Sequence, residues 1–140
     1  MTQLTQRATE ASRYIEAAVE AAAVKKAERI VVLDVSRQLV ITDHFVICSG
    51  NSERQVHTIA EAIEHRLHRD LDIKPLRREG HRESRWMILD YVDFMVHVFH
   101  TQERDYYDLE RLWADAPVLE LNHIAQDGDN DEPAAAAEAP

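Results

Sequence analysis

Two apolar runs that follow each other closely, "RWMILDY" at residues 85–91 and "DFMVHVF" at 93–99, limit the possible folds most. Both are short and rich in aliphatic and aromatic residues, as strands are. A short turn near Tyr91 and Val92 joins them, which is the arrangement of an antiparallel hairpin. The sequence therefore predicts such a hairpin in the C-terminal half.

Two further strands and three helices are predicted around this hairpin. "RIVVLDV" at 29–35 and "HFVICSG" at 44–50 are short and apolar, whereas residues 9–27 carry apolar side chains at helical spacing. A second helix follows "GNS" to about Arg69, with Ser52 as its cap and Gln55 reaching back in a capping box. A third is predicted over "RDYYDLERLW", 104–113. The order α-β-β-α-β-β-α indicates an α/β fold, a mixed β-sheet flanked by helices.

The charge divides the chain into two parts. Residues 1–122 can build one α/β domain, and 123–140 form an acidic, alanine-rich segment that we expect to be a disordered tail. The tail contributes half of the formal net charge of −10 through Asp127, Asp129, Asp131, Glu132 and Glu138. Because binding to nucleic acid draws on lysine and arginine, we expect no direct grip on a phosphate backbone and favour a basic protein partner.

Neither a membrane span nor a leader segment is evident, so we expect a cytoplasmic protein without membrane contact. The single cysteine, Cys48, lies in the apolar run "FVIC" and is predicted to be a buried structural thiol.

An enzyme site has one candidate at the glycine and serine of "GNS", Gly50 and Ser52, where amides at a strand-to-helix junction could hold phosphate. Nucleotidyl transfer also needs carboxylates that converge on divalent metals. Asp90 and Asp93 are three residues apart and flank a turn, so they do not share a strand face. We therefore predict no catalytic residue, no metal and no cofactor, and Ser52 is explained as a helix cap.

Histidines supply two more candidates. His57, Glu61, His65 and His68 recur along one helix in a way that could ligate zinc, but they also form the polar face expected opposite Val56 and Ile59. His97 could act as a base with Asp90 or Asp93, although a strand histidine is more often a hydrogen-bonded structural residue. We favour the structural interpretation of both.

The two tryptophans can be interpreted as core or as interface. Alternation along the strand must turn either Trp86 and Ile88, or Met87 and Leu89, toward the helices, and on the pattern alone we favour Trp86 in the core. Trp113, which lies with Leu109 and Leu112 on the last predicted helix, is expected in the core.

Five blocks, in order and with compatible gaps, resemble the bacterial ribosomal silencing factor family, also called the Iojap-related family. They are "VLDVS", "ITDHFVICSGNSERQV", "REG", "WMILDYVDFMVHVF" and "ERDYYDLERLW". The resemblance runs from about residue 10 to 115 and implies a nucleotidyltransferase-like architecture without catalysis; the alternative is an active enzyme on a nucleotide substrate. Family-like positions with a structural role would be Asp34, Asp43, Gly50, Ser52, Gln55, Asp90, Asp93, His97, Tyr107 and Trp113.

The resemblance also implies a partner and a mechanism. The family represses translation when nutrients are scarce, by binding the fourteenth protein of the large ribosomal subunit, on the face that meets the small subunit, and blocking subunit joining. A homodimer is a further expected assembly. The contacts implied for this chain are Trp86, Met87, Leu76, Arg85, Glu79 and Gly80.

One position departs from the family pattern. Val92 stands where a glycine usually separates the two hairpin aspartates. Glycine tolerates a positive φ in a tight turn and valine does not, so we expect a differently shaped hairpin connection.

Overall fold

The computed structural model describes residues 2–80 and 84–119, with side chains from residue 10 onward. In chain order the helices and strands are α1 Thr2–Val24, β1 Glu28–Asp34, β2 His44–Gly50, α2 Glu53–Leu71, β3 Arg77–Glu79, β4 Trp86–Asp90, β5 Phe94–His100, α3 Thr101–Tyr107 and α4 Leu109–Leu112. The predicted tail lies outside the described residues. Within them, no helix combines the length and apolar character that a membrane span requires.

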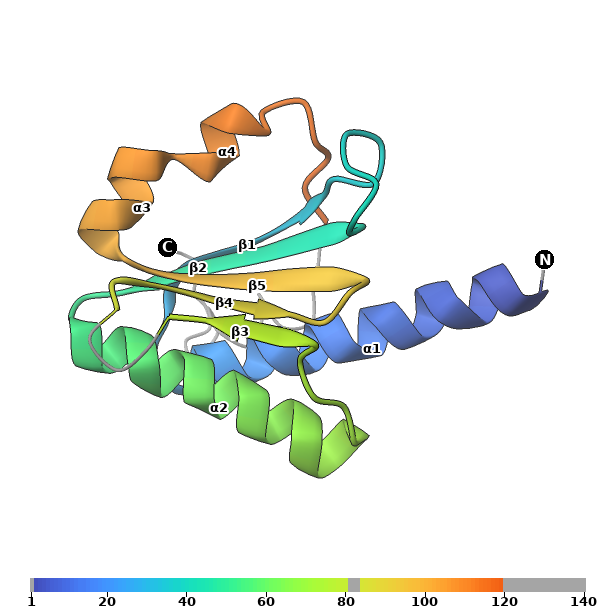
Figure 1. Ribbon diagram of the computed structural model, residues 1–140, viewed down its shortest axis with the longest axis horizontal. Helices are drawn as coiled ribbons and strands as arrows, with labels where there is room; N and C mark the ends of the chain where they lie inside the picture. Colours follow the sequence, from blue (N-terminus) through green and yellow to red (C-terminus); the bar gives the residue numbers. More distant parts are fainter. Residues whose placement is uncertain (1, 81–83, 120–140) are drawn as a thin grey trace, which may run out of the picture.

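The strands form one five-stranded mixed sheet in the order β1-β2-β5-β4-β3. β2 and β5 run parallel at its centre, and the other neighbouring pairs are antiparallel. Helices α1 and α2 cover one face, and α3 and α4 lie on the other (Figure 1). The predicted mixed sheet flanked by helices is confirmed, and the nucleotidyltransferase-like architecture stays a prediction.

Alternation along the strands produces two apolar layers. Val46, Cys48, Met87 and Leu89 face α1 and α2 and are fully buried, which confirms the burial of Cys48. Phe45, Ile47 and Phe99 point to the opposite face, where Leu109 and Trp113 pack against them. Trp113 is only partly buried, with its ring 5.7 Å from that of Phe45.

Helix α2 begins as predicted, with a small difference in its cap. The Ser52 hydroxyl accepts a hydrogen bond from the Gln55 amide at 3.1 Å. The Gln55 side chain reaches back to the amide of Asn51 at 2.7 Å, one residue earlier than in a standard capping box. Its amide group also donates to the carbonyl oxygens of Lys25 and Lys26 after α1. Gln55 therefore connects the ends of two helices.

Two elements differ from the predictions. Strand β3 has no counterpart among the predicted strands, since "RRE" carries no apolar residue and is paired to β4 by the backbone. The last helix starts earlier, at Thr101, and is broken at Asp108, which has a left-handed φ of 49°. This break leaves Tyr106 and Leu112 exposed instead of on a buried helical face.

The hairpin connection corrects our expectation for Val92. Its φ is +75°, and the Asp93 amide donates to the Tyr91 carbonyl oxygen at 2.9 Å, so Val92 is the central residue of a γ-turn. The Asp90 carboxylate accepts from the Val92 amide at 2.9 Å, and the Tyr91 amide donates to Phe94 at 2.9 Å. These bonds hold valine in a conformation that costs a β-branched residue about 1–3 kcal/mol.

Val92→Gly should therefore stabilise the protein by about 1 kcal/mol, because glycine adopts a positive φ without steric strain. The greater freedom of glycine in the unfolded chain offsets part of this gain. Urea unfolding monitored by circular dichroism measures the change. Val92→Ala serves as the control: it retains a Cβ atom and should recover less stability than glycine. A glycine variant no more stable than the parent would show that the turn holds no strain.

Candidate functional site

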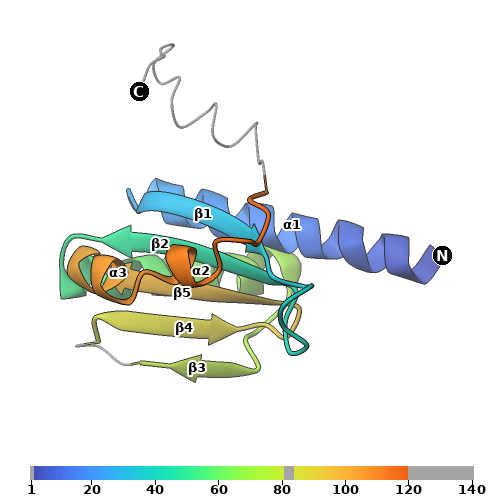
Figure 2. The same ribbon diagram turned by 90° about the horizontal axis from the view of Figure 1, so that it is seen from above.

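The two helical layers do not cover the sheet equally. α1 lies behind β1 and α2 behind the centre of the sheet, whereas α3 and α4 lie over β2 and β5 on the opposite face and leave β3 and β4 uncovered there (Figure 2). We call this uncovered area the open face. It is formed by Glu79, Trp86 and Ile88 of the two strands, with Tyr107 at the end of α3 beside Trp86. Glu79 and Tyr107 are exposed, and Trp86 and Ile88 are half-buried.

Trp86 is held in one orientation from three sides. Its ring stacks on Phe99 at 4.7 Å and contacts Tyr107 at 4.8 Å between ring centroids. Its indole N–H donates to Nδ1 of His97 at 3.2 Å. Such a side chain loses little conformational freedom when a partner covers it, which is typical of interface residues that dominate binding.

His97 supports this arrangement from inside the sheet. It is 5% exposed, and burial lowers the pKa of its imidazole to about 4. The ring is therefore neutral near pH 7, so Nδ1 can accept the hydrogen bond from Trp86. His97 is thus buried and hydrogen-bonded to Trp86, and its purely structural role stays a prediction.

Gly80 brings the end of β3 close to the start of β4. Its φ is +100°, and a Cβ atom there would lie 2.9 Å from the Trp86 carbonyl oxygen. Any larger residue would push this segment away from Trp86, so Gly80 fixes the distance between them. Glu79, one residue earlier, pairs with Ile88 and shares its face of the sheet.

Arg85 precedes Trp86 and joins α2 to α3. Its guanidinium group lies 2.8 Å from Glu103 and 3.3 Å from Glu53, and it donates to Gln102 at 2.6 Å. The hydrogen bond to Glu103 is the main cause of its raised pKa. These three contacts fix the Arg85 side chain beside the open face, and its contact with a partner stays a prediction.

Two expected contacts do not lie with Trp86. Met87 is fully buried in the layer against α1 and α2, because it points to the sheet face opposite its neighbour, so it is removed from the candidate contacts. Leu76 is 68% exposed, but its amide donates to Asp90, at the far end of β4 from Trp86. Ile88, by contrast, joins Trp86 because strand side chains two residues apart share a face.

Asp34, Asp43 and Gly50, three further family-like positions, make local contacts. Asp34 accepts from the amide and hydroxyl of Ser36, and the hydroxyl contact is the main cause of its lowered pKa. The Asp43 amide donates to the Asp93 carbonyl oxygen at 3.0 Å, connecting the β1–β2 loop to the hairpin turn. A Cβ atom at Gly50 would lie 3.2 Å from the side chain of Gln55.

The carboxylates and helix terminus that a nucleotidyl transferase would use to hold metal and phosphate make other contacts in this structure. The Asp90 carboxylate pairs with Arg77 at 3.0 Å and accepts from the Val92 amide. The start of α2 holds the Ser52 cap and the acid Glu53, which would repel a phosphate. Within the described residues, no three His, Cys, Asp or Glu side chains gather as a metal site requires. His57 pairs with Glu61 at 3.1 Å, and His65 and His68 are exposed.

The chain matches proteins of one family over most of its length. A family model described as ribosomal silencing factor during starvation matches residues 8–140. Two proteins named ribosomal silencing factor RsfS are each 44% identical: one of Halalkalibacterium halodurans over 79% of this chain and 93% of its own, and one of Bacillus subtilis over 70% and 82%.

A solved structure points to the same family. The crystal structure of a Chromobacterium violaceum protein superimposes with a TM-score of 0.70 at 31% identity, over 74% of this chain and 85% of its own. The fold and the sequence therefore agree, and the chain belongs to the ribosomal silencing factor family.

Proposed function

We propose that this protein silences ribosomes by binding the large subunit through the open face and sterically blocking its association with the small subunit. The proposed contact is the fourteenth protein of the large subunit, on the face that meets the small subunit. Relatives support a ribosomal role, since their names include ribosomal silencing factor and, for a mouse protein 28% identical, mitochondrial assembly of ribosomal large subunit protein 1. The proposed place of action is the cytoplasm.

The observation that carries the proposal is the half-buried Trp86, held in place by its neighbours on an uncovered part of the sheet. Aromatic side chains fixed by their own packing are the residues that most often dominate protein interfaces. Glu79 and Tyr107 frame it with exposed polar groups, as at the rim of an interface. The formal net charge of −10 favours approach to a basic ribosomal protein.

The function requires no bond to be broken. A folded domain seated between two subunits prevents their contact by its volume alone, and its effect then depends on affinity and occupancy. Nucleotidyl transfer, the alternative suggested by architecture, gains no support from the described residues, because Glu53 occupies the α2 terminus and Arg77 pairs with Asp90.

Sedimentation with separated ribosomal subunits tests the proposal. We expect the protein to move with large subunits and, at saturating concentration, to reduce the fraction of paired subunits in a sucrose gradient. Small subunits alone should not retain it. Movement with small subunits only, or undisturbed pairing at saturation, would contradict the proposed function.

A further inference from the structure

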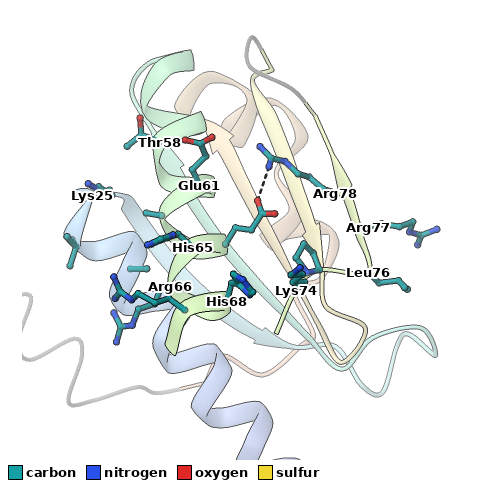
Figure 3. Close-up of a pocket in the computed structure, with 16 residues that line it drawn as sticks. Lys25, Thr58, Glu61, His65, Arg66, His68, Lys74, Leu76, Arg77 and Arg78 are labelled. Atoms are coloured by element: carbon teal, nitrogen blue, oxygen red, sulfur yellow. Dashed lines mark hydrogen bonds and ion pairs between the residues drawn. The ribbon is translucent and has the colours of Figure 1, made fainter. Parts of the chain in front are cut away.

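Basic side chains gather around the outer surface of α2, against the acidic character of the whole chain. A groove of about 1210 Å³ lies there, between the end of α1, α2 and residues 74–78 (Figure 3). Its lining includes two acids, Glu61 and Glu64, and the basic residues Lys25, Arg66, Arg69, Lys74, Arg77 and Arg78. We call this the α2 groove. It holds six of the 16 lysines and arginines of the chain but two of its 26 acids.

The four arginines of the groove already form ion pairs with carboxylates. Arg78 lies 2.8 Å from Glu64, Arg66 pairs with Glu20 and Asp70, and Arg69 pairs with Asp70. Arg77 points away from the groove in Figure 3 and pairs with Asp90. These pairs are largely at the surface, where each is worth about 0–1 kcal/mol, so a competing anion can share the guanidinium groups.

Lys25 and Lys74 differ from the arginines. Across residues 10–80 and 84–119, neither ammonium group has a carboxylate within ion-pair distance. They lie on opposite sides of the groove, one after α1 and the other after α2, with the exposed imidazoles of His65 and His68 also in the lining. The groove therefore offers unused positive charge together with N–H donors.

The dimensions fit a polymer better than a small metabolite. The volume exceeds the roughly 300–1,000 Å³ of small-molecule sites. The α2 residues of the lining run from Thr58 to Arg69, a length of about 17 Å at the helical rise, which matches about five stacked nucleotides. Val24 and Leu76 are the exposed large apolar residues of the lining, so there is little to hold an acidic peptide by apolar contact.

We propose that the α2 groove binds the phosphate backbone of RNA. The net charge of the chain argued against such binding, but net charge averages over the surface, and phosphate contacts depend on the local density of lysine and arginine. α2 lies on the face of the sheet opposite α3 and α4 (Figure 1). The α2 groove and the open face are therefore on opposite faces, and both can be occupied at once. The inference extends the proposed function without depending on it: ribosomal RNA would be the RNA within reach on a subunit.

Fluorescence anisotropy with a labelled 12-nucleotide oligouridylate, titrated with the full chain between about 50 and 200 mM salt, tests the groove directly. The variant Lys25→Gln/Lys74→Gln should bind about three- to tenfold more weakly at low salt. Its slope of log affinity against log salt should be smaller by about 1.4, since each lost phosphate contact to a single strand removes about 0.7. The control Arg37→Gln/Arg54→Gln removes the same charge at exposed positions outside the groove and should stay within about twofold of the parent, a margin of about 0.4 kcal/mol.

Several results would overturn the inference. These are no binding by the parent, equal losses in both double variants, and displacement of the RNA by millimolar inorganic phosphate, which would indicate a free-anion site. Displacement by a poly-glutamate peptide as effective as unlabelled RNA would instead assign the groove to an acidic protein segment. Trp86→Glu should bind the oligonucleotide like the parent, so failure of the groove and failure of the proposed function give different results.

Discussion

Arg104→Ala should lower the free energy of unfolding by about 3–5 kcal/mol, the range for breaking a buried ion pair from one side. Arg104 is 1% exposed and donates to the Arg29 carbonyl oxygen at 2.6 Å and to the Ser49 hydroxyl at 3.3 Å. It also forms two hydrogen bonds to the Glu110 carboxylate, at 2.6 and 3.1 Å, which lower the pKa of Glu110. Alanine would leave these acceptors without their donor beneath α3 and α4.

Chemical denaturation of the parent and the variant measures this loss. Arg29→Ala is the matched control, because Arg29 pairs with Asp105 at the surface and its removal should cost less than about 1 kcal/mol. The double variant Arg104→Ala/Glu110→Ala should recover part of the loss, since no carboxylate then remains without its partner. Equal effects of the Arg104 and Arg29 substitutions would show that the buried arginine does not support this half of the fold.

Trp86→Glu should weaken binding to the large subunit by about 30-fold or more, equivalent to about 2 kcal/mol, the loss expected when a central interface aromatic is removed. The substitution also introduces a negative charge on the open face. Because Trp86 stacks on Phe99 and donates to His97, some stability will be lost as well. Pull-down with the isolated large-subunit protein and thermal melting, on one preparation, separate the two effects.

Two further variants make the Trp86 result decisive. Glu79→Lys changes an exposed side chain of the open face, so it should reduce binding without lowering the melting temperature. Val40→Glu introduces a negative charge, as Trp86→Glu does, but at a residue that is 99% exposed in the β1–β2 loop, away from the open face. This variant should bind like the parent. A folded Trp86→Glu protein with parental affinity would exclude the open face as the ribosome-binding surface.

The sequence predicted elements whose signals are local. The strand at 44–50 has the predicted bounds, and Ser52 caps α2, because apolar runs and capping side chains act within a few residues. β3 could not be predicted in this way, since "RRE" becomes a strand only through its pairing with β4. The break at Asp108 likewise has no glycine or proline to mark it.

The site depended on information that no single segment carries. Alternation showed that Trp86 and Met87 face opposite sides, but which side is covered depends on the placement of α1 and α2, far away in the sequence. The basic groove was hidden for the same reason. Lys25, the α2 residues and Lys74 come from three separate segments, and the overall negative charge obscured their proximity.

The two edges of the sheet bear on how this protein behaves at high concentration. An edge strand with free backbone groups can pair with another molecule and start aggregation. At β1 the edge is covered, because Asp34 and Val32 bond to Pro117 and Leu119. At the opposite edge β3 has three residues and carries two arginines and a glutamate. Short length and charge both discourage intermolecular strand pairing, so the sheet can expose an apolar open face with little risk of growing edge to edge into an aggregate.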